Sequence, residues 1–409
     1  MSRILVYISP ARGHIFPLVP TLQALARRGH QIHARCLAAE VERLTALGFQ
    51  AAPLDPTVEG RELDDWKAET PPEALVRAVT TFVDRAPAEI RDLNAAIAAI
   101  QPDGLFIDIN TWGASAAAEA SGRPWAAFAP YFLPIPGPGI PPWGLGLAPA
   151  TGPEVEPRDQ FLWAFVAGLL DQVRAPLNAI RQQAGARPFA HVIEYATAAP
   201  HLLYYTAEPF EYPRRPWPAN VRLVGPGIWE PDSGTIPDLE LGDRPLVLAT
   251  CSTEFQNDRA LAECTLAGLA DEPVAVVVTT AASNPAGLTI PANARVARFL
   301  PHGLLLKFAA CVICHGGMGI TQKALAAGVP LCVAPFGRDQ YEVARHVAVA
   351  GAGVCLPAPE LTPERLRQAV REALEMRPGA RRIAAAFQAA GGAETAADAL
   401  EEGMRRPRP

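Results

Sequence analysis

The chain has 409 residues, of which 49% are hydrophobic, and a formal net charge of −6. This length favours two domains, each with its own core. The acidic balance and the scattered arginines argue against a basic face for nucleic acid, and no apolar run reaches the roughly 18 residues that a membrane span needs. The first residues do not resemble a secretory signal, which predicts a cytoplasmic protein.

Short apolar strands alternate with helical segments in the first half of the chain, as in parallel sheets with crossover helices. We predict a loop over 11–17, directly after the first strand. The predicted strands cover 3–9, 31–37, 103–109 and 124–130, and the predicted helices cover 18–28, 82–100, 112–122 and 161–185.

A segment rich in proline and glycine, residues 134–157, interrupts this alternation. Its composition excludes a regular element, and it follows a strand end, where α/β proteins place ligands. We interpret it as one wall of a binding pocket. A plain surface connection is the alternative.

The alternation starts again after a stretch dense in Pro, Gly and Asp. We predict a linker over 216–242 between a first domain, 1–215, and a second domain, 243–385. A helix and tail over 386–409 follow, with packing back on the first domain as one option. The predicted strands of the second domain cover 245–251, 273–281, 294–301, 310–314 and 330–335, and helices are predicted at 257–270, 319–328 and 362–401. The fold class is therefore α/β, with two Rossmann-like, doubly wound parallel sheets.

Cys311, Cys314 and His315 have the C-x-x-C-H spacing of c-type haem attachment. Haem attachment needs two accessible thiols, whereas Val312 and Ile313 make this run look like a buried parallel strand. The sequence also offers no second C-x-x-C pair to complete a zinc site. We therefore interpret both cysteines as apolar strand residues.

The same strand ends in His315-Gly316-Gly317, and a helix is predicted to follow. Backbone amides at a helix N-terminus attract phosphate, and glycines let the ligand approach closely. The pattern predicts a phosphate or diphosphate site, with a structural tight turn as the alternative.

Another predicted strand is followed by Arg338, Asp339 and Gln340. A carboxylate beside an amide can both accept hydrogen bonds from sugar hydroxyls and donate them. We predict a sugar-binding pair, Asp339 and Gln340. A helix N-cap by Asp339 is the alternative.

His14 lies in the predicted loop after the first strand, and Asp108 ends the strand over 103–109. A carboxylate that faces a histidine fixes its tautomer and raises its basicity, so the two residues would form a dyad able to take a proton from a hydroxyl. The alternative is a structural histidine.

Four segments, 13–30, 267–280, 297–340 and 351–353, carry a resemblance to a known family. They resemble the inverting nucleotide-sugar-dependent glycosyltransferases of family 1, which have the GT-B fold and include plant secondary-metabolite enzymes and bacterial antibiotic and macrolide enzymes. The similarity covers nearly the whole chain, in order. It implies two Rossmann-like domains that face each other across a cleft.

The resemblance also implies roles for individual positions. His14, in the G-H-x-x-P motif of the family, matches the catalytic base, and Asp108 matches the acid that orients it. For the donor, the turn His315-Gly316-Gly317 and Thr253 match positions that bind the diphosphate in the family. Phe299 stands where many members have a Trp that stacks on the nucleobase. Asp339 and Gln340 match the pair that binds the donor sugar. The full set matched to donor binding is His315, Gly316, Gly317, Gly319, Thr253, Phe299, Asp339 and Gln340. We expect Phe132 and Trp143 to contact the acceptor.

Some positions depart from the plant-like pattern. Met318, Gly319 and Ile320 replace a Trp-Asn-Ser run, and His302 replaces a Gln. Lys323 stands where many UDP-sugar enzymes have a Glu that holds the ribose hydroxyls, and a cation cannot accept their hydrogens. A dTDP-deoxysugar is therefore at least as good a candidate donor as a UDP-sugar.

The implied reaction is direct displacement: a hydroxyl of an apolar acceptor, aromatic or polyketide-like, attacks the anomeric carbon opposite the nucleoside diphosphate. The sequence contains no D-x-D, so we predict that no metal or other cofactor is needed. A sugar-nucleotide epimerase or hydrolase of the same fold, and a non-catalytic homologue that acts as a partner protein, are the alternatives. A monomer and a homodimer both remain open.

Overall fold

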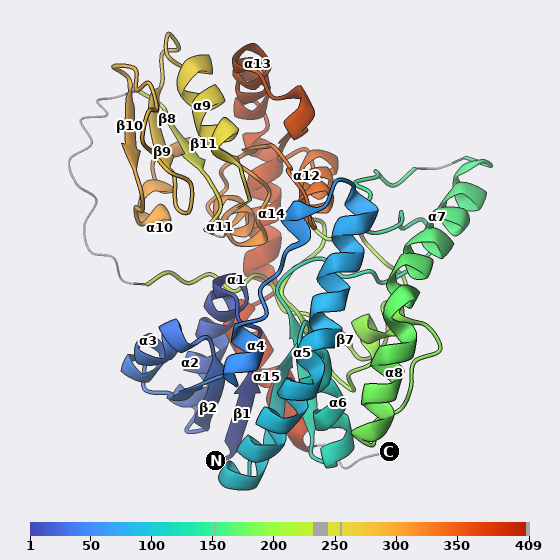
Figure 1. Ribbon diagram of the computed structural model, residues 1–409. Helices are drawn as coiled ribbons and strands as arrows, with labels where there is room; N and C mark the ends of the chain where they lie inside the picture. The colour runs from blue at the N-terminus through green and yellow to red at the C-terminus, as the bar shows by residue number, and fades with distance from the viewer. Residues whose placement is uncertain (151, 232–243, 254–255, 406–409) are drawn as a thin grey trace.

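The computed structural model describes residues 1–150, 152–231, 244–253 and 256–405. Two α/β domains, each built on one sheet, make up this part of the chain (Figure 1). The first sheet has the strand order β3-β2-β1-β4-β5-β6-β7, and the second has the order β10-β9-β8-β11-β12-β13. Every pair of neighbouring strands is parallel, which confirms the predicted fold class.

The first domain and its helices take up the first half of the chain. Its strands are β1 (Arg3–Tyr7), β2 (Gln31–Cys36), β3 (Gln50–Pro53), β4 (Gly104–Asp108), β5 (Trp125–Ala129), β6 (Leu202–Tyr204) and β7 (Val221–Leu223). Its helices are α1 (Arg12–Ile15), α2 (Val19–Arg27), α3 (Val41–Ala46), α4 (Pro56–Glu59), α5 (Pro71–Ile100), α6 (Trp112–Ser121), α7 (Val155–Leu170) and α8 (Arg174–Gln183).

The second domain repeats the design. Its strands are β8 (Leu246–Thr250), β9 (Ala275–Thr279), β10 (Ala294–Ala297), β11 (Ala309–Cys314), β12 (Leu331–Val333) and β13 (Gly353–Cys355). The helices that follow are α9 (Arg259–Gly268), α10 (His302–Leu305), α11 (Met318–Ala326), α12 (Gln340–Val349), α13 (Pro363–Leu374), α14 (Arg377–Ala389) and α15 (Gly392–Arg405).

Each sheet reverses its strand order at one point, between β1 and β4 in the first domain and between β8 and β11 in the second. At such a point the loops after the two strands run in opposite directions, so that a crevice opens at their carboxyl ends. His14 follows β1 and Asp108 ends β4, whereas Thr253 follows β8 and His315 follows β11. The fold thus brings the candidate residues to the two switch points.

The linker prediction needs correction. Val221–Leu223 forms β7, which pairs with β6, so the first sheet extends into the predicted linker over 216–242. The predicted boundary after residue 385 falls inside α14, and the chain turns at Gly391 and Gly392, which both have positive φ angles. Of the predicted linker, residues 232–242 lie outside the described part of the chain.

Two helical segments differ from their predictions. The predicted loop over 11–17 contains a helical turn, α1, because the amides of His14 and Ile15 donate to the carbonyl of Ala11. Helix α5 begins at Pro71 rather than at residue 82, since Thr70 caps it through the amide of Glu73 at 3.4 Å. No helix among the described residues is long and apolar enough to cross a membrane.

The last helix, α15, packs on α2 of the first domain, although it follows the second domain in sequence. Arg28, the C-cap residue of α2, contacts Glu394 and Asp398 on α15 at 2.6 and 2.7 Å. His30 lies 3.0 Å from Glu401. The chain therefore returns from the second domain to the first before α15 (Figure 1).

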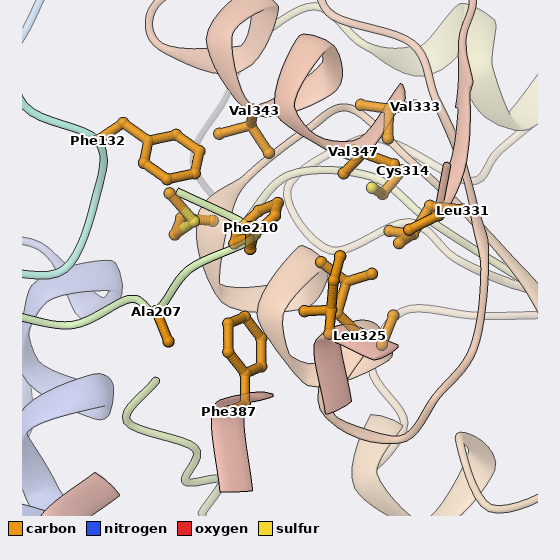
Figure 2. Packing of buried hydrophobic residues seen from close by; sticks show 14 of the residues in the cluster. Phe132, Ala207, Phe210, Cys314, Leu325, Leu331, Val333, Val343, Val347 and Phe387 are labelled. Carbon is orange, nitrogen blue, oxygen red and sulfur yellow. The ribbon is translucent and has the colours of Figure 1, made fainter. Parts of the chain in front are cut away.

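One apolar core contains buried side chains of both domains and joins them (Figure 2). Phe132 and Phe210 of the first domain pack with ring centroids 5.0 Å apart, and Phe210 also contacts Phe387 on α14 at 5.7 Å. Val343 and Val347 on α12 belong to the same cluster. Because these side chains are buried, this core holds α12 and α14 against the first domain.

Candidate active site

His14 and Asp108 are in direct contact. The imidazole Nδ1 lies 2.9 Å from Oδ2 and 3.0 Å from Oδ1 of the carboxylate. The side chain of Asp108 is fully buried, whereas 14% of the His14 side chain is exposed. The buried carboxylate of Asp108 therefore orients the imidazole of His14, and the imidazole remains partly accessible to solvent.

The carboxylate of Asp108 is fixed by backbone amides of the segments that follow β1 and β4. Its Oδ2 accepts from the amide of Ser9 at 3.0 Å, and its Oδ1 accepts from the amide of Asn110 at 2.9 Å. The hydroxyl of Thr111 donates to the Asp108 carbonyl at 2.7 Å. With backbone donors on both oxygens, the buried anion is satisfied and cannot turn away from His14.

In the second domain, β11 leads into the turn His315-Gly316-Gly317 and then into α11. Gly316 has a φ of +94°, and a Cβ there would lie 3.0 Å from Val333 and 3.1 Å from the carbonyl of Gln340. A Cβ on Gly317 would lie 2.5 Å from Nε2 of His315. Both glycines are therefore required for the turn, and Gly317 leaves room for the imidazole.

The start of α11 faces open space, since a Cβ on Gly319 would meet nothing within 4 Å. Thr253 is exposed and follows β8, which is the neighbour of β11 in the sheet. Phe299 is 62% exposed, and its ring lies 5.9 Å from the guanidinium carbon of Arg298. Thr253 and Phe299 are therefore accessible to a ligand, and their roles in donor binding stay predictions.

Asp339 stands at the N-cap position of α12, but its side chain makes no capping hydrogen bond. Burial raises the pKa of its carboxyl, whereas Arg338 and His14 lower it. The carboxyl of Asp339 is therefore not used by the helix that it begins. The capping alternative is thereby disfavoured.

Gln340 is buried, and its amide contacts other parts of the protein. Its Oε1 accepts from the amides of Phe336 and Gly337 at 2.8 and 3.2 Å, and its Nε2 donates to Gln256. The side chain thus shapes the loop before α12. Of the predicted sugar pair, Asp339 is the residue whose side chain is not used in this way.

Arg338 joins the two domains beside the candidate site. Its guanidinium contacts the carboxylate of Asp65, in a turn of the first domain, through two hydrogen bonds of 2.7 and 3.1 Å. Asp65 is only 5% exposed, and Arg338 adopts a φ of +55°, which is unusual for a residue with a side chain. This contact holds the loop of Asp339 against the first domain.

Lys323 on α11 pairs with Glu230, which arrives from the segment between the domains, at 2.7 Å. The other oxygen of Glu230 accepts from the amide of Gly303 at 2.7 Å. Burial lowers the pKa of the neighbouring His302 to about 4, opposed by Glu230 and reinforced by Lys323. Lys323 therefore pairs with an acidic side chain.

The two residues expected to contact the acceptor, Phe132 and Trp143, line the same small cavity. Phe132 is 1% exposed and stacks on His346 of α12 at 3.9 Å, so its ring also belongs to the core between the domains. Trp143 is half-buried and donates from Nε1 to the carbonyl of Phe132 at 2.8 Å. Its contact with an acceptor stays a prediction.

The segment 134–157 contains no strand and no helix before α7 among its described residues. Helix α12 holds it, because Glu342 accepts from the amides of Gly144 and Gly146 at 2.9 and 3.4 Å, and Arg345 donates to the Gly146 carbonyl at 2.7 Å. The helix that begins after Asp339 thus also positions the segment that we predict to form a wall of the binding pocket.

Cys311 and Cys314 are fully buried in β11. Burial raises the pKa of the Cys311 thiol to about 12 and that of Cys314 to about 11. These are the properties of apolar strand residues, and they disagree with the accessible thiols of a haem-attachment loop.

Sequence reasoning missed two polar neighbours of His14. Nδ2 of Asn110 lies 3.4 Å from Nε2 of His14, and the hydroxyl of Tyr131 donates to Oδ1 of Asn110 at 2.6 Å. Both residues directly follow strands, Asn110 after β4 and Tyr131 after β5. Their position at strand ends was the available signal.

Comparisons with known proteins agree with this fold. Residues 263–402 match the family of the erythromycin biosynthesis protein CIII-like C-terminal domain. Over 395 residues, 91% of this chain and 92% of the relative, the sequence is 31% identical to the 4'-demethylrebeccamycin synthase of Lentzea aerocolonigenes. It is 36% identical to a PGL/p-HBAD biosynthesis rhamnosyltransferase of Mycobacterium bovis, over 52% of this chain and 48% of the relative.

Solved structures share the fold. The calicheamicin glycosyltransferase CalG4 superimposes with a TM-score of 0.78 at 22% identity, and the whole of both chains is covered. The glycosyltransferase VinC, solved in complex with dTDP, superimposes with a TM-score of 0.70 at 24% identity over 99% of this chain and 100% of that chain. Two parallel-sheet domains of this kind define the GT-B fold of glycosyltransferases. The chain belongs to the family 1 glycosyltransferases of the antibiotic type.

Proposed function

We propose that the enzyme transfers a sugar from a dTDP- or UDP-sugar to a hydroxyl of an apolar small molecule and inverts the anomeric carbon. One observation carries this proposal: the buried Asp108 orients His14 at 2.9 Å, and the contact of Arg338 with Asp65 holds the neighbouring Asp339 of the second domain against the first. A base from one domain thus meets a sugar-binding candidate from the other.

The acceptor is activated in the first domain. With a proton on Nδ1 that is donated to Asp108, the lone pair on Nε2 of His14 takes the proton of the acceptor hydroxyl. The oxygen forms a bond to the anomeric carbon while the bond from that carbon to the diphosphate breaks, and the diphosphate leaves with the electron pair. Asp108 stabilises the imidazolium that results.

The leaving group is stabilised in the second domain. The N-terminus of α11 presents backbone amides and the positive end of the helix dipole beside His315, at a turn that only glycines allow. Donors fixed in advance stabilise the charge that grows on the diphosphate. This charge stabilisation supports a reaction without a metal, and activity in the presence of a chelator tests that proposal.

The donor identity rests on the pair of Lys323 and Glu230. Lys323 is paired with Glu230 at 2.7 Å, and the other oxygen of Glu230 is used by the amide of Gly303, so neither side chain replaces the Glu that holds ribose hydroxyls in many UDP-sugar enzymes. A dTDP-deoxysugar fits this arrangement, because 2-deoxyribose lacks one of the hydroxyls that a ribose-binding Glu would hold. The mycobacterial relative is named as a rhamnosyltransferase, and rhamnose is a deoxyhexose.

The acceptor is proposed to be apolar and aromatic or polyketide-like. Trp143 is half-buried in a loop that α12 holds, and the rebeccamycin-type relative is an enzyme of natural-product biosynthesis. The structure offers no separate observation in favour of an epimerase, a hydrolase or a non-catalytic partner.

The test is an assay with dTDP- and UDP-sugars of known anomeric configuration and a panel of phenolic and polyketide acceptors, with and without EDTA. We expect a glycoside of inverted configuration, formed equally well with the chelator. Retained configuration would contradict direct displacement. Free sugar formed at the same rate without any acceptor would indicate a hydrolase instead.

A further inference from the structure

A second polar chain, Tyr131 to Asn110, ends at the catalytic face of His14. The hydroxyl of Tyr131 lies 2.6 Å from Oδ1 of Asn110, and Nδ2 of the same amide lies 3.4 Å from Nε2 of His14. The rings of His14 and Tyr131 are 5.7 Å apart. The imidazole is thus contacted on both nitrogens, by Asp108 at Nδ1 and by Asn110 at Nε2.

The distances fix the orientation of the amide. A separation of 2.6 Å suits an O–H···O hydrogen bond better than an N–H···O one, so Tyr131 faces the carbonyl oxygen of Asn110. The NH₂ group then faces Nε2 of His14 and donates to its lone pair. The backbone amide of Asn110 also donates to Asp108 at 2.9 Å, which ties this residue to both members of the dyad.

The charges near His14 bear on its protonation. Asp108 at the end of β4 faces Nδ1, and a carboxylate in that position stabilises the protonated form of an imidazole. Asp339 at the N-cap position of α12 is an acidic group of the other domain, and His14 lowers the pKa of its carboxyl. On α1 itself, the guanidinium of Arg12 is directed to Glu40 at 2.6 Å. A protonated base cannot accept the proton of a hydroxyl, so a group that acts on Nε2 bears on the reaction.

We propose that Asn110, held in orientation by Tyr131, is a positioning residue that keeps Nε2 of His14 unprotonated and directed at the acceptor. An N–H donor at Nε2 stabilises the neutral imidazole and would repel a proton there. The contact of 3.4 Å is long, so an acceptor hydroxyl can replace it at little cost. This inference rests on the proposed function, in which His14 is the base.

The test compares the pH profile of kcat/KM for the wild type, Asn110→Asp and Tyr131→Phe. In Asn110→Asp a carboxylate accepts from the protonated Nε2, so the acidic limb moves upward by about one pH unit or more, and activity recovers at higher pH. In Tyr131→Phe the side-chain amide of Asn110 loses the hydrogen bond that orients it, so we expect the acidic limb of the pH profile to move upward by a smaller amount. Tyr205→Phe is the matched control: its buried hydroxyl pairs with Thr21 at 2.7 Å, away from His14, and we expect no movement.

A measurement without turnover gives an independent answer. The titration of the His14 imidazole in the free enzyme, followed by NMR, should move to higher pH in Asn110→Asp and not in Tyr205→Phe. Losses of activity that are equal at every pH, with an unmoved titration, would overturn the proposal and reduce Asn110 to a packing residue. If His14→Ala were fully active, the proposed function would fail instead, and the titration would still report whether Asn110 acts on His14.

Discussion

Nδ1 of His14 lies 2.9 Å from Oδ2 of Asp108, although 94 positions separate the two residues in the sequence. The switch point between β1 and β4 produces this contact, because β1 and β4 are neighbours in the sheet and end at the same edge. Two backbone amides hold the carboxylate in place.

Asp108→Asn should lower kcat by about 100-fold or more, within the range of a general base that has lost its orientation. Three N–H groups, of Ser9, Asn110 and His14, point at the carboxylate, and an amide would set its own NH₂ group against at least one of them. The KM for the donor should change little, since the donor site lies in the other domain.

Asp103→Asn is the control for this variant. Asp103 is exposed just before the other end of β4 and accepts from the amide of Arg3, far from His14. Steady-state kinetics on both variants decides the point. A kcat for Asp108→Asn close to that of Asp103→Asn would contradict the orienting role.

Gly317→Ala should weaken the binding of a nucleoside diphosphate by about 10- to 100-fold. The new methyl group would lie 2.5 Å from Nε2 of His315 and force the imidazole out of its place. A hydrogen bond to a charged group contributes about 1.5–3 kcal/mol, which corresponds to that range in Kd. Calorimetry with dTDP and UDP measures the change.

Gly168→Ala on α7 is the matched control, because an added methyl group there meets nothing within 4 Å. We expect its nucleotide affinity to equal that of the wild type. Unchanged affinity in Gly317→Ala as well would show that His315 is not a ligand of the diphosphate.

The stability of the enzyme should depend on pH through His302. Burial lowers the pKa of this side chain from 6.5 to about 4 in the folded protein, so the unfolded chain takes up a proton first as the pH falls. The stabilisation is complete above about pH 6.5 and is lost between about pH 6.5 and 4. His302→Gln should keep a bond to the hydroxyl of Thr279, which lies 2.9 Å from His302, and should lose this pH dependence.

Thermal unfolding at a series of pH values tests this prediction. The Tm of the wild type should fall more steeply than that of His302→Gln between about pH 6.5 and 4. Parallel curves would contradict the lowered pKa of His302.

The cysteines of β11 should be dispensable for chemistry. Cys311→Ala with Cys314→Ala should cost stability, about 1 kcal/mol or more at each site, yet should retain most of the transfer activity well below Tm. His315→Ala, next in the chain, should lose the use of the donor. Rapid alkylation of these thiols in the folded enzyme, or loss of activity in the double variant alone, would favour the haem or redox interpretation.

The sequence predicted the central strands well, because strands buried on both faces are continuous apolar runs such as Leu246–Thr250. It did not reveal β3, β6, β7 or β13, which are short strands of three or four residues. The candidate base and its acid were found through a family resemblance and a strand-end position. The contact between Glu342 and Gly144 had no signal, since it depends on how α12 packs against the other domain.

The measurement that tests the account most directly is the rate of glycoside formation by His14→Ala with the best donor and acceptor of the wild type. The account predicts that kcat/KM falls by about 10²- to 10⁴-fold, as expected for the loss of a general base, while thermal shifts show unchanged binding of the nucleoside diphosphate. An undiminished rate in this variant would contradict the assignment of His14 as the base.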